Sequence, residues 1–118
     1  MAKINTKMNY DQKEDIFILS KNKKVKASID LGDFIIDVDK DGFVSGIEIL
    51  NASQNLGLAE EQLKELKLAS MNVVYKPNYV YITIIMNFGL KEKDIHIPLT
   101  IDLGHGSVTT EKTNFAIV

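Results

Sequence analysis

Residues 34–50 read FIIDVDKDGFVSGIEIL, and this stretch decides the fold class because two apolar runs flank the dipeptide Asp41-Gly42. Asp-Gly between apolar runs is a strong signal for a β-hairpin, since glycine adopts the positive φ of a tight turn without steric cost. In the second arm, Phe43, Ile47 and Ile49 lie two or four residues apart and would share one face of a strand. We therefore predict a hairpin whose second strand turns Phe43 toward the core.

The same stretch also matches a calcium-binding loop. Residues 37–48 fit the pattern D-x-D-x-D-G-x5-E, in which carboxylate oxygens surround one calcium ion. The candidate ligands are Asp37, Asp39, Asp41 and Glu48. A helix should enter such a loop, yet residues 29–36 have the pattern of a strand. A hairpin would place the first and last ligands on opposite arms, so we favour the hairpin and keep calcium binding as an alternative.

Apolar runs of similar character continue on both sides of this hairpin, whereas only one segment has a helical period. Runs of about four to eight β-branched, aromatic and aliphatic residues are typical of strands. We expect further strands at 16–19, 71–75, 79–88, 95–101 and 115–118. Ala59, Leu63 and Leu66 are spaced i, i+4 and i+7, which predicts a helix over residues 59–69. The expected fold is a single α+β domain of antiparallel strands that pack against this principal helix.

Two segments of the chain repeat at an offset of 72 residues. Ile29-Asp30-Leu31-Gly32 recurs at residues 101–104, and residues 39–43 (DKDGF) correspond to residues 111–115 (EKTNF). The repeat suggests two pseudo-symmetric β units, 8–50 and 73–118, joined by a helical connection at 54–70. Both Phe43 and Phe115 would then follow equivalent turns and face the core. Chance similarity between strand-rich segments is the alternative explanation.

Composition excludes several classes of function. The 118 residues carry a net charge of −2 and contain no arginine, which argues against nucleic-acid binding through a basic face. The absence of cysteine excludes disulfides and thiolate metal sites. No apolar run is long enough to cross a membrane, so we expect a soluble, cytoplasmic protein. The lysines at positions 21, 23, 24 and 26 fit a solvated turn better than a contact patch.

No recognisable catalytic constellation is present in the sequence. His96 and His105 have no His or Cys neighbour at metal-ligand spacing. The serines lie in no nucleophile-elbow pattern, and the segment Gly104-His105-Gly106 lacks the third glycine of a phosphate-binding loop. We therefore expect a protein that is not an enzyme, although side chains distant in the sequence can still assemble a site in space.

One strand offers a candidate interface. Residues 79–88 alternate so that one face is wholly apolar, while the other carries Tyr79, Tyr81 and Ile85 among polar residues. Aromatic, semi-polar faces are typical of protein interfaces. The leading hypothesis is a protein-interaction module that forms a homo-oligomer or binds a protein partner. The alternative is that another layer of the same domain, such as the helix at 59–69, covers this face.

Three stretches resemble a prokaryotic family of domains of unknown function, family 2283. They are Tyr10-Asp11 followed by residues 15–19 (DIFIL), residues 37–42 (DVDKDG), and residues 44–53 (VSGIEILNAS). The resemblance covers residues 8–53, and the second half of the chain departs from the short members. It implies a β-hairpin at Asp41-Gly42 and no established activity. Some members are suspected antitoxins, so an antitoxin-like partner of a small toxin is a further hypothesis.

Overall fold

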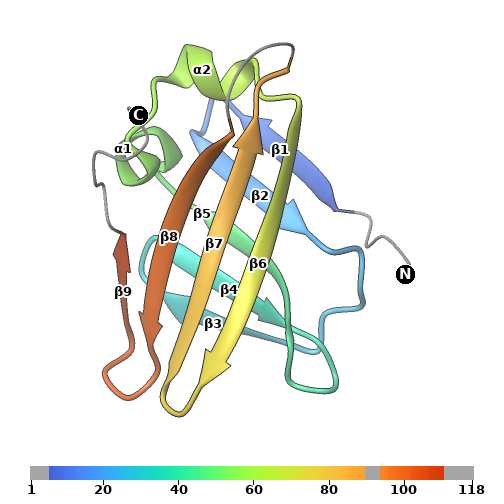
Figure 1. The fold of residues 1–118 in the computed structure, drawn as a ribbon, viewed down its shortest axis with the longest axis vertical. Helices are drawn as coiled ribbons and strands as arrows, with labels where there is room; N and C mark the ends of the chain where they lie inside the picture. The colour runs from blue at the N-terminus through green and yellow to red at the C-terminus, as the bar shows by residue number, and fades with distance from the viewer. Residues whose placement is uncertain (1–5, 90–93, 111–118) are drawn as a thin grey trace.

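The computed structural model describes residues 6–89 and 94–110, which form two antiparallel β-sheets and two short helices (Figure 1). The first sheet contains β1 (Lys7–Asp11), β2 (Ile16–Ser20), β3 (Ala27–Leu31), β4 (Phe34–Val38) and β5 (Val44–Ile49). The helices follow as α1 (Ala52–Leu56) and α2 (Glu60–Lys64). The second sheet contains β6 (Leu68–Lys76), β7 (Tyr79–Asn87), β8 (Ile95–Asp102) and β9 (Ser107–Thr110). The strand-rich α+β class is thus confirmed.

The first sheet has the strand order β1-β2-β5-β4-β3. Strands β3, β4 and β5 follow one another as hairpins, and the loop from β2 to β3 crosses the ends of β5 and β4. This is a Greek-key arrangement, in which one long connection returns the chain to the edge of the sheet. The β4–β5 hairpin predicted from Asp41-Gly42 is confirmed.

The turn of that hairpin is fixed by Asp39. The Gly42 N–H donates to the Asp39 carbonyl at 3.0 Å, and the Asp39 N–H donates to the Phe43 carbonyl at 2.9 Å. The buried Asp39 carboxylate accepts the N–H groups of Asp41 and Phe43 at 2.9 and 3.0 Å. Gly42 has φ 87°, as a type I turn followed by a glycine bulge requires. The carboxylate of Asp39 therefore serves the turn.

The expectation that Phe43 faces the core is wrong, because its side chain is 55% exposed. The register of β4 and β5 shifts between Asp37 and Val38, so that Val44 pairs with Val38 and takes the buried position. A bulge places an extra residue in one strand and interrupts the alternation of faces. The sequence period of two therefore holds for Ile47 and Ile49 and fails at the turn.

The second sheet is a meander with the order β6-β7-β8-β9. Its β6–β7 hairpin turns at Pro77 and Asn78, and Asn78 takes the positive φ of 67°. The inner face of β7 is buried as predicted, and so is most of the inner face of β8. Those buried residues are Val80, Ile82, Ile84, Met86, Ile97, Leu99 and Ile101. Strand β9 had not been anticipated, and the strand expected at 115–118 lies outside the described residues.

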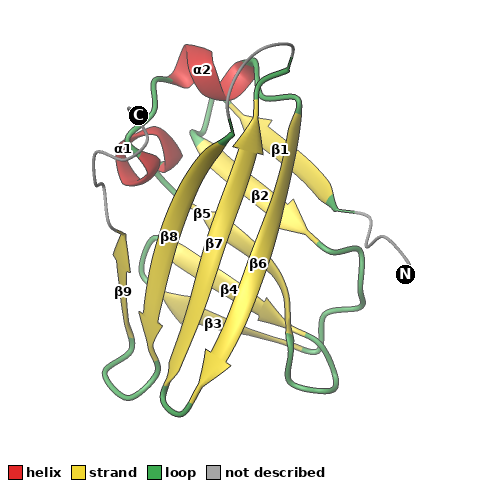
Figure 2. Ribbon diagram, in the orientation of Figure 1, coloured by secondary structure: helices red, strands yellow, loops and turns green. Residues whose placement is uncertain are grey.

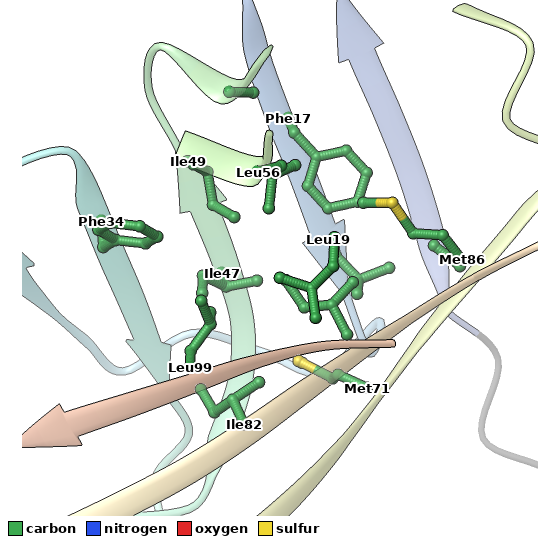
Figure 3. Packing of buried hydrophobic residues seen from close by; sticks show 14 of the residues in the cluster. Phe17, Leu19, Phe34, Ile47, Ile49, Leu56, Met71, Ile82, Met86 and Leu99 are labelled. Carbon is green, nitrogen blue, oxygen red and sulfur yellow. The ribbon is translucent and has the colours of Figure 1, made fainter. Parts of the chain in front are cut away.

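The core lies between the two sheets, which pack face to face with strands running obliquely to each other (Figure 3). Phe17 and Leu19 from β2 meet residues such as Met71 and Met86 from the second sheet (Figure 3). The helices close one end of this sandwich, at the top of Figure 2. The sheets therefore pack mainly on each other, whereas the sequence had suggested that the strands pack on one helix.

The helical segment is shorter than the predicted 59–69. Gly57, with φ 70°, ends α1, and α2 ends at Lys64. The Lys67 N–H donates to the Asn87 carbonyl at 2.9 Å, which starts the pairing of β6 with β7. Leu63 is buried beneath α2, and Leu66 is buried just beyond it. No helix in the described ranges is long and apolar enough to span a membrane.

The internal repeat has limited structural support. Both copies form a strand followed by a turn, yet the first turns through two residues and the second through four. Ile29 is exposed, whereas its counterpart Ile101 is buried. The two sheets also differ in strand order. Residues 111–114 and Phe115 lie outside the described residues, so the expected equivalence of their turn with that at 39–42 stays a prediction.

Candidate interaction surface

The outer face of the second sheet holds all three residues predicted for an interface. Tyr79, Tyr81 and Ile85 alternate along β7, where the two tyrosines are exposed and Ile85 is half-buried. The tyrosine rings stack with centroids 6.2 Å apart and planes 13° apart. Val74 of β6 pairs with Tyr81 and is 51% exposed. An aromatic and aliphatic surface thus crosses two neighbouring strands.

This surface extends to the free side of β6. Strand β6 is the first strand in the order of its sheet, and its residues 68–75 (LASMNVVY) contain no charge and no proline. Leu68 at its start is the most exposed large apolar residue among those described. We call the set Leu68, Val74, Tyr79, Tyr81 and Ile85 the β6–β7 surface. Natural edge strands are usually protected by charges, prolines or bulges, and β6 lacks these devices before Lys76.

The two helices leave the β6–β7 surface uncovered near the tyrosines. They lie at one end of the sandwich, whereas Tyr79 begins β7 directly after the turn at its opposite end (Figure 1). The alternative that the helix at 59–69 covers this face is therefore wrong for Tyr79 and Tyr81. Lys76 and Asp102 bring charge to this face beside Tyr79, since both pair with it across the strands.

A second aromatic contact ties β6 to the first sheet. The Val44 N–H donates to the hydroxyl of Tyr75 at 2.8 Å. The rings of Tyr75 and Phe43 meet edge to face with centroids 5.5 Å apart. At the other end of β6, the Thr6 hydroxyl donates to the Ala69 carbonyl at 2.8 Å. These contacts hold β6 in place as a rigid platform for the β6–β7 surface.

The four candidate calcium ligands do not converge. Asp37 pairs with Gly46 in the sheet and accepts the hydroxyl of Ser28 at 2.7 Å. Glu48 pairs with Ile35 farther along the same hairpin, away from the turn that holds Asp39 and Asp41. Within residues 6–89 and 94–110, no group of three or more His, Asp or Glu side chains is placed to hold a metal ion. A β-hairpin replaces the helix–loop–helix geometry that the motif needs.

A polar network joins the β1–β2 turn to helix α1. The Asp15 carboxylate accepts the Tyr10 hydroxyl at 2.6 Å, the Ser53 hydroxyl at 2.7 Å and the Ser53 N–H at 3.0 Å. Burial and then the hydrogen bond to Asp15 raise the pKa of Tyr10 well above its ordinary value. Burial alone would raise the pKa of Asp15, but the hydrogen bonds from Tyr10 and Ser53 outweigh it and lower that pKa. The network is a structural clamp of a donor phenol and an ionised carboxylate.

The two histidines lie on the surface of the second sheet. His105 is exposed in the β8–β9 turn, where its Nδ1 lies 2.9 Å from the Asp102 carboxylate. The hydrogen bond to His105 lowers the pKa of Asp102. His96 is exposed on β8, in register with Ile85. Among the described residues, neither histidine belongs to a group of three or more side chains that could hold a metal ion.

The fold and the surface define a class: a two-sheet α+β domain whose second sheet leaves an aromatic face open. The chain matches the family model "Protein of unknown function (DUF2283)" over residues 7–53. It is also 35% identical over 89 residues to a "Putative hypoxanthine phosphoribosyltransferase" of Methanosarcina mazei, covering 75% of this chain and 72% of that protein. Residues 7–53 belong to the DUF2283 family, and the resemblance seen in the sequence is confirmed.

A second relative matches a shorter stretch. The "Uncharacterized protein MJ0789" of Methanocaldococcus jannaschii is 42% identical over 52 residues, which are 43% of this chain and 45% of that protein. The chain thus covers less than half the length of that relative. No solved structure matches the chain. The family model itself covers the first sheet and the start of α1, whereas the β6–β7 surface lies beyond the matched residues.

Sequence reasoning missed part of this surface. Leu68 lies outside the strand expected over 71–75, and Val74 and Tyr75, although inside it, are not among the predicted interface residues. The sequence does contain a sign of the longer strand, because residues 68–75 form one uncharged run. In the structure, exposed and buried residues alternate from Leu68 to Asn72. The contact of Tyr75 with Phe43 joins residues 32 positions apart, and no local pattern reveals it.

Proposed function

We propose that this protein is a non-enzymatic interaction module that associates with a second copy of itself through the β6–β7 surface. The observation that carries the proposal is an exposed aromatic surface beside β6, an edge strand that carries no charge over residues 68–75 and that Thr6 contacts at Ala69. Tyrosine is enriched at interfaces because its side chain buries a large area with few rotatable bonds. Contiguous exposed apolar surface on a folded domain marks an interaction site.

A second copy fits this surface better than a partner of opposite charge. Residues 68–75 and 79–90 carry no charged side chain, so little on the β6–β7 surface selects an acidic or basic partner. A twofold dimer places the same patch against itself, which requires a patch that does not repel its own copy. An uncharged surface meets this condition, and the edge of β6 offers backbone groups that an antiparallel copy of β6 complements.

The fold does not support the activity in the name of the Methanosarcina mazei relative, a putative hypoxanthine phosphoribosyltransferase. Nucleotide-binding α/β folds hold phosphates where glycine-rich loops join parallel strands to helices. Both described sheets of this chain are antiparallel, and the strand pairings include no parallel neighbours within the described residues. The chain also lacks a glycine-rich phosphate loop in its sequence. These facts support the hypothesis of an interaction module that does not bind nucleotides in the way these α/β folds do.

Sedimentation velocity over a wide concentration range tests the proposal. The variant Val74→Lys adds a charge at the centre of the surface, and two like charges would face each other across a twofold contact. Leu103→Lys is a matched control, because Leu103 is 47% exposed and lies in the β8–β9 turn. We expect a dimer for the wild type and Leu103→Lys, and a monomer for Val74→Lys. A wild-type protein that stays monomeric at high concentration contradicts the proposal.

A further inference from the structure

The lysine-rich loop between β2 and β3 is anchored at both ends. The Lys21 N–H donates to the Ser45 carbonyl at 2.8 Å, and the Lys26 N–H donates to the Val38 carbonyl at 2.8 Å. Asn22 turns the chain with φ 61°, and its N–H donates to the Ser20 hydroxyl at 3.1 Å. The intervening residues therefore cross the ends of β5 and β4 as a bridge with two fixed supports.

This bridge and the β4–β5 turn enclose an open cavity of about 340 Å³. Its lining consists of Lys23, Lys24, Val25, Lys26, Asp39, Lys40 and Asp41. Both walls are held by hydrogen bonds, since Asp39 fixes the turn on the other side. The volume is in the range of small-ligand sites, which begin at about 300 Å³.

Four lysines are among the residues that line this cavity, and none of them has an ion-pair partner among the described residues. Among the described residues the only ion pair joins His105 and Asp102, so the lysines bind neither Asp39 nor Asp41 within 4.0 Å. The Asp39 carboxylate is already engaged by two N–H groups of its own turn. Four positive and two negative side chains leave the lining with an excess of positive charge, on a chain whose net charge is −2.

We propose that this cavity is a binding site for a multiply charged phosphate group of a small molecule, such as a pyrophosphate. Lysine binds phosphate as a point charge, so tetrahedral oxyanions suit it without the planar fork of arginine. Each exposed lysine contributes little alone, because water and salt screen its charge. Only a ligand whose several negative charges lie close together is attracted by all four lysines at once. This site is independent of the β6–β7 surface.

Titration of ¹⁵N-labelled protein with inorganic pyrophosphate, followed by amide chemical shifts at constant ionic strength, tests the proposal. Acetate at the same ionic strength is the monovalent comparison. We expect saturable shifts that are centred on residues 21–26 and 39–42 and are produced by pyrophosphate and not by acetate. Shifts of equal size with both anions would reflect screening alone and would overturn the proposal, and so would the absence of saturable shifts.

A pair of double variants separates the site from general charge attraction. Lys24→Gln with Lys26→Gln removes two charges from the cavity, whereas Lys13→Gln with Lys67→Gln removes two exposed charges elsewhere. A unit charge near 4 Å in water changes affinity by about fivefold, so the cavity pair should weaken binding by tenfold or more. The control pair should change it less than about threefold, given screening over about 10 Å. Equal losses in both pairs would overturn the site, and unchanged melting temperatures verify that the variants fold.

Discussion

The two sheets share one core but carry different kinds of residues on their outer faces. The outer face of the first sheet carries Asp30, Asp37 and Glu48, and its strands are five or six residues long. The second sheet has strands of nine residues at β6 and β7, with exposed tyrosine and valine on its outer face near the β6–β7 turn. Charge on short strands keeps the first sheet from pairing with other chains, whereas the second sheet lacks this protection. Under the proposed function, this contrast leaves association to the second sheet.

The largest expected effect comes from the core that the two sheets share. Phe17→Ala in β2 and Ile82→Ala in β7 each remove a side chain with no exposed area. Each should lower the free energy of unfolding by about 3–5 kcal/mol, because a cavity remains where the side chain was. Phe17→Leu keeps most of the volume and should cost less than about 2 kcal/mol. Urea denaturation followed by circular dichroism measures these values.

The same experiment tests whether the sheets fold as one unit. A single unfolding transition for the wild type and both alanine variants is expected, because each side chain packs in one continuous cluster with the other sheet. Two separate transitions, with only one shifted in each variant, would show that the sheets are independent layers. Each sheet would then behave as a separate domain.

A smaller effect is expected at the Tyr10–Asp15–Ser53 clamp of the first sheet. Tyr10→Phe removes the hydrogen bond to Asp15 and should cost about 1 kcal/mol near neutral pH. The pKa of Asp15 is lowered in the folded state from its ordinary 3.8, so its contribution to stability is present above pH 4 and is lost as the pH falls through the folded pKa. The variant should flatten this acid limb of the stability profile, as measured by thermal unfolding at several pH values.

Ser53→Ala provides the matched variant for this clamp. It removes one hydroxyl donor to Asp15 but leaves the Ser53 N–H in place. The acid limb should therefore lose part of its slope, and a double variant should lose more than either single one. A Tyr10→Phe protein whose stability falls with the same slope below pH 4 as that of the wild type would show that Asp15 is not held ionised by this network.

The smallest expected effect is that of calcium on the β4–β5 hairpin. Since Asp37 and Glu48 lie in the sheet and Asp39 serves the turn, millimolar calcium should leave the melting temperature unchanged. A ligand that binds the native state must raise stability by mass action. A melting temperature that rises with calcium, and that no longer rises in Asp41→Asn, would revive the calcium-loop reading of residues 37–48.

The sequence predicts buried faces well where strands pair regularly. In β7 and β8, strict alternation places each second residue against the first sheet, so local pattern and burial agree. The turns at Asp41-Gly42 and at Asn78 can also be predicted from the sequence, because few residues accept a positive φ. These features depend on residues close together in the chain.

Features that depend on distant parts of the chain escaped prediction. Phe43 is exposed instead of buried because a bulge shifts the register of β4 and β5. The helix stopped early because the Asn87 carbonyl, from another strand, pairs with Lys67. The lysine cavity arises where a crossover loop passes the turn of a different hairpin. For Tyr79, Tyr81 and Ile85 the pattern sufficed to place them on one face, but only the fold shows what lies beside it.

The proposed association through the second sheet is tested most directly by distances between labels on the two outer faces. The chain has no cysteine, so Asn72→Cys on β6 and Asp30→Cys on β3 each introduce one site for a nitroxide label. In a dimer through the β6–β7 surface, paired electron spins at residue 72 should lie within about 20 Å, because neighbouring strands are about 5 Å apart. Labels at residue 30 should lie much farther apart, on opposite sides of the dimer. Short distances at residue 30 and long ones at residue 72 would contradict the account.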